Sequence, residues 1–239
     1  MNLEKYRQYS RIARGMEDAD LVLKDARIVN VFTEEIIRGD IAIQDGIIAG
    51  IGSFHGKEER NLAGKYVCPG FIDSHLHLES TLVTPAELVT VASRHGTTTF
   101  IVDPHESANV SGLKGIDYIL EQTENVKANV YVMMPSCVPA TVIDDNGCTL
   151  TAEDMAPYLR NGRILGLGEV MDSISVVQGD KAMHDKLELF EGRIRDGHAP
   201  FLEEGDLQAY AMAGIATDHE CSFFDYAMRE RRNGINVLI

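Results

Sequence analysis

The sequence predicts an α/β protein in which part of a small β-sandwich precedes an incomplete (β/α)8 barrel of the TIM type. Three observations support this prediction. Residues 20–52 have the pattern of short strands joined by turns, the pattern changes near Lys65, and strand-like and helix-like segments then alternate six times. Alternation every 25 to 35 residues or so indicates parallel βαβ units, of which a closed barrel has eight in about 250 residues. We therefore expect an N-terminal segment with the partial sandwich at residues 1–64. A barrel of about six and a half units, truncated before strand eight, should follow at residues 65–239.

Short apolar runs define the first module. Residues 21–23, 28–31 and 41–43 are strand-like, and the last of these runs is separated from Ile47-Ile48 by Asp45-Gly46. An Asp-Gly pair between two apolar runs is a strong signal for a two-residue β-hairpin turn. The sequence thus predicts a small all-β module.

The barrel elements follow from β-branched runs and helix-capping residues. Pro85 can open a helix that reaches about Arg94, and Thr151 with Asp154 three residues on has capping-box chemistry. Strands are expected up to about His77, at residues 97–102, 129–134 and 164–170, up to His198, up to His219, and from residue 235, where a seventh begins. The remaining helices are expected near residues 113–124, 181–192, 206–213 and 222–232.

Composition narrows the classes of partner. The chain has 22 Lys and Arg against 37 Asp and Glu, a net charge of −15. Such a surface repels phosphate backbones and anionic lipids, which disfavours nucleic acid and membranes and leaves a small-molecule substrate, with a homo-oligomer still open. The N-terminus lacks the apolar stretch of a secretory signal, and the four cysteines are scattered without a CxxC pair. A cytoplasmic location is therefore expected.

Four histidines and a glutamate lie at the ends of predicted barrel strands. His75 and His77 are two residues apart, so on a strand they point to the same side and can bind one cation. Alone, this HxH pattern arises often by chance. Glu169 ends the glycine-rich fourth strand, where a buried carboxylate needs a cation or a salt bridge to Arg or Lys. His198 and His219 close the fifth and sixth strands. The coincidence of all five at the barrel mouth predicts a metal site.

The chemistry of these residues predicts hydrolysis. Imidazole and carboxylate ligands without thiolate suit zinc, manganese or iron(II). Two cations that share a carboxylate lower the pKa of a water molecule between them, which provides a nucleophile at neutral pH. Asp103 is a further carboxylate at the barrel mouth, although before Pro104 it could simply form an Asx turn. His105, two residues later, has no clear role.

These residues resemble a known family. Pro69-Gly70-Phe71-Ile72-Asp73-Ser74-His75-Leu76-His77 resembles the first-strand signature of the amidohydrolase superfamily. More specific segments resemble the adenine deaminases over about residues 10–239: 77–81, 103–106, 109–110, 136–140, 168–171, 196–200 and 218–220.

The resemblance implies conversion of adenine to hypoxanthine and ammonia, with two divalent metals, Mn²⁺ or Fe²⁺. By the family pattern His75 and His77 bind one metal, His198 and His219 bind the other, and Glu169 bridges them. Asp103 matches a family active-site carboxylate that transfers a proton or contacts substrate. Glu220 is a weaker catalytic candidate, which rests only on its place beside His219.

The sequence also departs from the family pattern. The superfamily supplies an aspartate from strand eight, both a metal ligand and the usual proton shuttle, and these 239 residues contain no such residue. Residues 201–204 stand where the family has a glycine-containing turn. We expect residues 1–239 by themselves to have weak or no deaminase activity.

The sequence leaves three alternative functions open. The chain could hydrolyse cyclic amides, although those enzymes commonly use a carboxylated lysine as the bridge, and no strand end here offers one. It could be a metal-binding fragment without catalysis. The unrelated zinc deaminases share the HxE fragment His77-Leu78-Glu79, but the PCxxC motif they require is absent.

Overall fold

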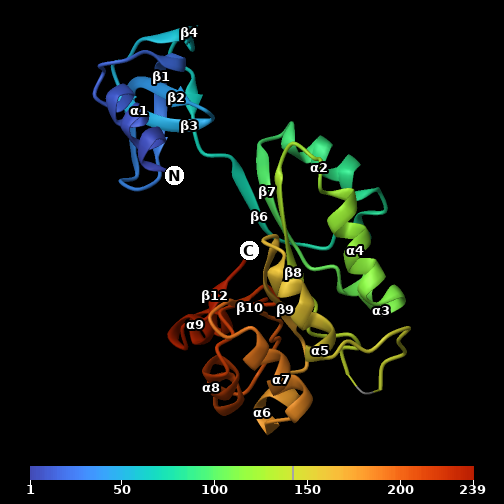
Figure 1. The fold of residues 1–239 in the computed structure, drawn as a ribbon. Helices are drawn as coiled ribbons and strands as arrows, with labels where there is room; N and C mark the ends of the chain where they lie inside the picture. The colour runs from blue at the N-terminus through green and yellow to red at the C-terminus, as the bar shows by residue number, and fades with distance from the viewer. Residues whose placement is uncertain (142) are drawn as a thin grey trace. The chain divides into compact units, whose positions relative to one another are not determined.

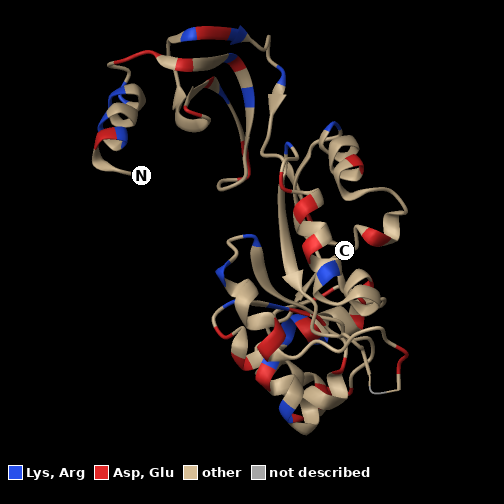
Figure 2. Cartoon of the chain, turned by 45° about the vertical axis from the view of Figure 1, so that its right-hand side comes forward, with Lys and Arg blue, Asp and Glu red and all other residues tan. Residues whose placement is uncertain are grey.

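The chain is divided into two compact units, each with its own core. The computed structural model describes residues 1–141 and 143–239, and its units are Met1–Pro69 and Gly70–Ile239 (Figure 1). The change from short strands to alternating strands and helices was predicted at Lys65. Acidic residues lie on strands and helices of both units (Figure 2).

The first unit is a five-stranded sheet with one helix. Its strands run in the order β3-β2-β1-β4, and β5 also pairs with β1. The Asp45-Gly46 turn between β2 and β3 has φ values of 50° and 76°, the left-handed backbone that such a hairpin turn requires. The elements are α1 (Leu3–Ala13), β1 (Ala19–Asn30), β2 (Glu35–Gln44), β3 (Ile47–Gly52), β4 (Gly56–Asn61) and β5 (Tyr66–Val67).

Two features of this unit differ from the sequence analysis. Helix α1 was not predicted, although the Asn2 side chain caps it by accepting a bond from the Lys5 backbone N–H, and Ile12 anchors it in a small core with Val22 and Phe54. The runs at residues 21–23 and 28–31 form one long strand, β1, rather than two. Its register shifts between Leu23 and Ala26, which interrupts the apolar pattern.

The second unit confirms the predicted partial barrel. Seven strands run in chain order, β12-β11-β10-β9-β8-β7-β6, and each adjacent pair is parallel. Their bounds are β6 (Phe71–Leu76), β7 (Thr97–Val102), β8 (Asn129–Met134), β9 (Ile164–Val170), β10 (Ile194–Gly197), β11 (Thr217–Asp218) and β12 (Asn236–Val237). Because sequential parallel neighbours need crossover connections, the helices between them follow from the topology.

The helices of this unit pack against a single apolar core that includes Phe100, Leu167 and Tyr210. The predicted ones appear as α2 (Pro85–Ser93), α4 (Leu113–Gln122), α5 (Ala152–Met155), α7 (Lys181–Leu189), α8 (Glu204–Met212) and α9 (Phe224–Arg232), with the capping box present at α5. Two short helices, α3 (His105–Ser111) and α6 (Ser173–Gln178), were missed because six or seven residues are too few to show a helical period. None of the helices in the described residues is long and apolar enough to cross a membrane.

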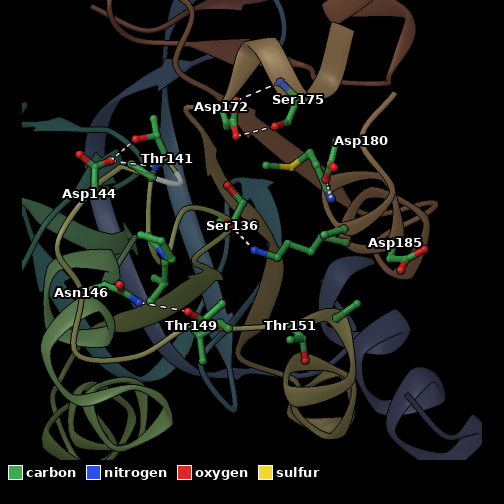
Figure 3. A pocket seen from close by; sticks show the side chains of 18 of the residues that line it. Ser136, Thr141, Asp144, Asn146, Thr149, Thr151, Asp172, Ser175, Asp180 and Asp185 are labelled. Carbon is green, nitrogen blue, oxygen red and sulfur yellow. Dashed lines mark hydrogen bonds between the residues drawn. The ribbon is translucent and has the colours of Figure 1, made fainter. Parts of the chain in front are cut away.

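A cavity of about 750 Å³ lies beside the segments that follow β8 and β9 (Figure 3). Its lining includes the polar residues Ser136, Asp172 and Asp180, together with the buried Lys186 from α7.

Glycine is needed where β9 and β10 approach each other. A Cβ atom added at Gly166 would lie 2.1 Å from the Ile194 carbonyl oxygen on β10, which is backbone and cannot rotate away. We expect Gly166→Ala to destabilise the protein by about 1–3 kcal/mol, the usual cost of overpacking. Chemical denaturation measures this change. Gly162→Ala is the matched control, because a Cβ there meets no atom within 4 Å. Equal midpoints for the two variants would contradict the prediction.

Candidate metal centre

The parallel sheet brings the five predicted ligands together around Glu169. His75 lies on β6 and His77 just beyond it, Glu169 is on β9, and His198 and His219 directly follow β10 and β11. Since the carboxyl ends of parallel strands meet at one edge of the sheet, these side chains converge although they are far apart in the chain. Each of the four histidines has a ring nitrogen within 4 Å of a Glu169 carboxylate oxygen.

His75 and His77 share one oxygen of Glu169. Their Nε2 atoms lie 3.0 Å and 2.8 Å from Oε1, and 3.1 Å from each other. The Nδ1 of His77 donates to the Asp103 carbonyl oxygen at 2.8 Å, and that of His75 bonds to the Asp196 carboxylate at 2.9 Å. With both protons on Nδ1, the two Nε2 lone pairs face each other, an arrangement that requires a proton or a metal cation between them.

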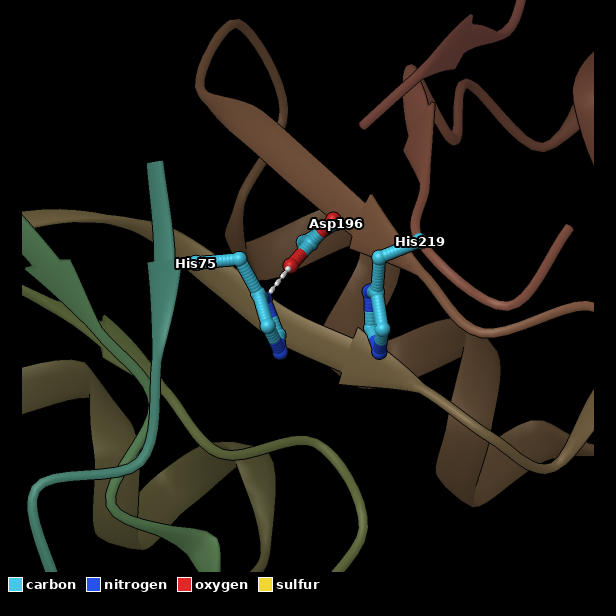
Figure 4. A group of neighbouring side chains, drawn as sticks. All are labelled: His75, Asp196 and His219. Atoms are coloured by element: carbon cyan, nitrogen blue, oxygen red, sulfur yellow. Dashed lines mark hydrogen bonds and ion pairs between the residues drawn. The ribbon is translucent and has the colours of Figure 1, made fainter. Parts of the chain in front are cut away.

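His198 and His219 approach the other oxygen of the same carboxylate. His198 Nδ1 is 3.0 Å and His219 Nε2 is 3.6 Å from Glu169 Oε2. The ring of His219 also stacks on that of His75, with centroids 3.7 Å apart, so the two pairs are adjacent (Figure 4). One carboxylate therefore contacts both pairs, one pair on each oxygen.

The backbone around His198 is fixed by buried polar groups. Its N–H donates to the Tyr210 hydroxyl at 3.0 Å, and the next N–H, of Ala199, donates to the Asp218 carboxylate at 2.6 Å. Tyr210 in turn donates to the Val170 carbonyl at the end of β9. These bonds tie the end of β10 to its neighbours on both sides.

Electrostatics favour a strongly anionic Glu169. Only 1% of the residue is exposed. Burial raises the pKa of this carboxyl, but the adjacent imidazoles of His198, His219, His75 and His77 outweigh burial and hold the pKa far below its usual range. Burial likewise lowers the pKa of both His75 and His77. The Asp196 and Glu169 carboxylates beside His75 outweigh this effect and raise its pKa to about 10. In His77 it is mainly the Glu169 carboxylate that raises the pKa, to about 9.

The residues fit a pair of divalent cations. Nitrogen and oxygen atoms of His75, His77 and Glu169 lie within 4.8 Å of one another, and so do those of Glu169, His198 and His219. Glu169 Oε1 has no hydrogen-bond partner of acceptable geometry among the described residues although two imidazoles lie beside it. A buried acceptor without a donor, among nitrogen lone pairs, is a suitable ligand set for a cation.

Asp103 lies deep in the site rather than in a local turn. It is 1% exposed, and its Oδ2 accepts a bond from the Glu169 backbone N–H at 2.7 Å, so it connects β7 to the end of β9. Gly168 permits this contact, because a Cβ there would lie 2.2 Å from Asp103 Oδ2. Its other oxygen, Oδ1, has no hydrogen-bond partner among the described residues and lies 3.6 Å from His105 Nδ1.

Glu220 lies at the margin of the site. Its side chain is 43% exposed, and Oε1 is 4.0 Å from His198 Nδ1 and 3.8 Å from His219 Nε2. It is therefore close enough to contact a molecule bound at the second histidine pair, but it is not part of the buried group.

Two residues of the site, His105 and Asp196, were not predicted from the sequence. His105 joins Asp103 and Glu169, with its Nδ1 3.8 Å from Glu169 Oε1. Asp196 is 4% exposed and orients His75 from β10. The spacing of Asp196 offered a signal, because it precedes His198 by two residues and so points to the same side of the strand.

Removal of the carboxylate that orients His75 should weaken metal binding. We expect Asp196→Asn to lower the affinity for Mn²⁺ or Zn²⁺ about 10- to 100-fold, the usual effect of losing the partner that fixes a histidine ligand. Titration calorimetry measures the change. Asp185→Asn, on the surface of α7, is the control and should bind as the parent does. An unchanged affinity in Asp196→Asn would refute this role.

Metal uptake should release protons. Raised pKa values of about 10 and 9 mean that the His75–His77 pair holds a proton between its Nε2 atoms near pH 7 when no metal is bound. A cation binds only the neutral imidazole, so binding displaces protons and apparent affinity rises with pH. Calorimetry at pH 7 in two buffers of different ionisation enthalpy gives the number of protons released per metal ion bound. The same heat in both buffers would show that no proton leaves.

Comparisons with known proteins identify the family of this chain. The amidohydrolase family model matches residues 66–238. An adenine deaminase of Desulfitobacterium hafniense is 57% identical over the whole chain, and one of Clostridium acetobutylicum is 48% identical over 95% of it; the chain spans 42% and 40% of their lengths. A solved N-acyl-D-glutamate deacylase of Bordetella bronchiseptica, complexed with zinc and a phosphonate inhibitor, shares the fold with a TM-score of 0.58 at 16% identity, over 92% of this chain and 58% of that one. This chain belongs to the amidohydrolase family.

Proposed function

We propose that this chain forms the metal-binding part of an adenine deaminase site, which hydrolyses adenine to hypoxanthine and ammonia. The observation that carries the proposal is the contact of one buried carboxylate, Glu169, with two histidine pairs. The names of the two curated relatives support adenine as the substrate.

The donor set assigns a role to each ligand. His75 and His77 would hold one cation, His198 and His219 the other, and Glu169 would bridge them. Imidazole and carboxylate donors suit Mn²⁺ or Fe²⁺, with Zn²⁺ as an alternative. When bound, divalent metal supplies the Lewis-acid chemistry that makes water a nucleophile at neutral pH.

Two carboxylates are placed to move protons. Asp103 Oδ1 is buried beside Glu169 and His105 and has no hydrogen-bond partner in the described part of the chain, so it can accept a proton from water within the site. Glu220 lies at the exposed margin and would serve the amine that leaves C6 of the purine. Asp196 keeps His75 in the tautomer that presents Nε2 to the site.

The setting of this activity is also a proposal. All four cysteines, which lie within the described residues, are free thiols, and this supports a reducing cytoplasm. The net charge of −15 supports a small-molecule partner rather than nucleic acid or a membrane, and a homo-oligomer is compatible with it.

Adenine binding and turnover test the proposal. The chain is loaded with Mn²⁺, Fe²⁺ under anaerobic conditions, or Zn²⁺, and is given adenine, dihydroorotate or hydantoin. We expect adenine to bind in a metal-dependent way, and any ammonia released to match hypoxanthine mole for mole by chromatography. Binding is measured beside turnover because it does not require the complete proton-transfer machinery.

Variants link that result to the site. Glu169→Gln should lower metal affinity by more than the roughly 100-fold that loss of an outer partner causes, and should abolish adenine binding. Glu121→Gln, at an exposed position on α4, is the matched control. The proposal fails if the metal-loaded chain binds a cyclic amide but not adenine, or if Glu169→Gln binds metal as the parent does.

A further inference from the structure

We propose that Lys186 is a positioning residue for the metal centre, which it supports through Ser136 and the backbone of Glu169. The inference concerns metal binding by the same site. It does not depend on the identity of the substrate.

Lys186 is a buried lysine on α7 without a carboxylate partner. It is 8% exposed, and no Asp or Glu oxygen among the described residues lies within 4 Å of its Nζ. Burial lowers the pKa of its ammonium group. A buried cation without a counter-ion is costly, so its retention calls for a specific interaction.

That interaction is with the segment that follows β8. Lys186 Nζ donates to the Ser136 carbonyl oxygen at 2.6 Å. Figure 3 shows Ser136 near the centre of the pocket. Ser136 is 1% exposed, and its hydroxyl donates to the Glu169 carbonyl oxygen at the end of β9. Ser136 therefore accepts a hydrogen bond from Lys186 and donates one to Glu169, whose carboxylate contacts both histidine pairs.

Glu169 is thus held on both sides of its peptide unit. Its carbonyl accepts from Ser136 and its N–H donates to Asp103. These two bonds fix the backbone from which the carboxylate extends, and a metal bridge tolerates little displacement of its ligand. Lys186 anchors the Ser136 side of this arrangement, because no other side-chain bond to the Ser136 carbonyl is present in the described residues.

A different role for Lys186, as the activator of Cys137, does not fit. Cys137 follows Ser136, and burial raises the pKa of its thiol well above the usual value, with Asp103 and Glu169 adding to the effect. The thiol is therefore neutral and does not pair with the ammonium.

The acidic residues of the pocket do not account for the lysine either. Asp172 accepts from the backbone N–H and hydroxyl of Ser175, Asp180 caps α7 by accepting from the Met183 N–H, and Asp185 binds Lys181. Each of these three carboxylates therefore has its own partner, and the Lys186 ammonium group donates to the Ser136 peptide.

Substitution at position 186 tests the proposal. We expect Lys186→Met, which keeps the length of the side chain but removes the donor, to lower Mn²⁺ affinity about 10- to 100-fold. The electron paramagnetic resonance spectrum of bound Mn²⁺ should also change, because the ligand geometry is altered. Lys186→Arg should recover much of the affinity, since the adjoining cavity can admit a guanidinium group that still donates to the carbonyl. Lys181→Met, on the exposed side of the same helix, is the control and should match the parent.

A double-mutant cycle identifies the route. Ser136→Ala removes the hydroxyl that holds Glu169 and leaves the carbonyl that Lys186 binds. If Lys186 acts through Ser136, the double variant should lose little more affinity than either single one. Additive losses, a parental affinity and spectrum in Lys186→Met, or equal loss in Lys181→Met would each overturn the proposal. If Lys186→Met does not fold, Ser136→Ala decides the matter: parental metal affinity in Ser136→Ala rejects the role. Adenine is not used, so failure here is distinct from failure of the proposed function.

Discussion

The second unit depends on the requirement to neutralise one buried carboxylate. Glu169 is almost inaccessible to solvent at the end of β9, where an isolated negative charge would be strongly unfavourable. Four imidazoles from three other strand ends surround it, and their proximity outweighs the burial that would otherwise raise the pKa of the carboxyl. The same arrangement that stabilises the charge also brings together nitrogen and oxygen donors that fit a cation.

A second layer of polar groups determines which atoms of these histidines face the centre. The Asp103 carbonyl and the Asp196 carboxylate each engage an Nδ1 atom, which leaves Nε2 of His77 and His75 directed at Glu169. Tyr210 and Asp218 bind the backbone beside His198. Because the orienting groups come from elements different from those of the histidines they hold, displacement of one element would move several side chains of the site at once.

Close packing of the sheet adds a steric constraint to the electrostatic one. Gly166 admits the Ile194 carbonyl, and Gly168 admits the Asp103 carboxylate, at distances that leave no space for a Cβ atom. The glycines in Gly166-Leu167-Gly168-Glu169 thus bring neighbouring strands close enough for Asp103 to bind the Glu169 backbone. This accounts for an apolar, glycine-containing strand that ends in an acidic residue.

The sequence by itself determined the parallel sheet, and it indicated the four histidines and the glutamate that lie together at its edge. Alternating segments predicted β7, β8 and β9 to the residue, the Asp-Gly hairpin is present, and the HxH spacing placed His75 and His77 on one side. Periodicity shows which side of a strand a residue faces, but it contains no information about which distant side chain lies opposite. Only the tertiary structure could pair Asp196 with His75, 121 residues apart, turn Asp103 toward the Glu169 backbone, and place Lys186 against Ser136. Those contacts follow from the register of neighbouring strands and from helix packing, which arise only when the whole sheet is assembled.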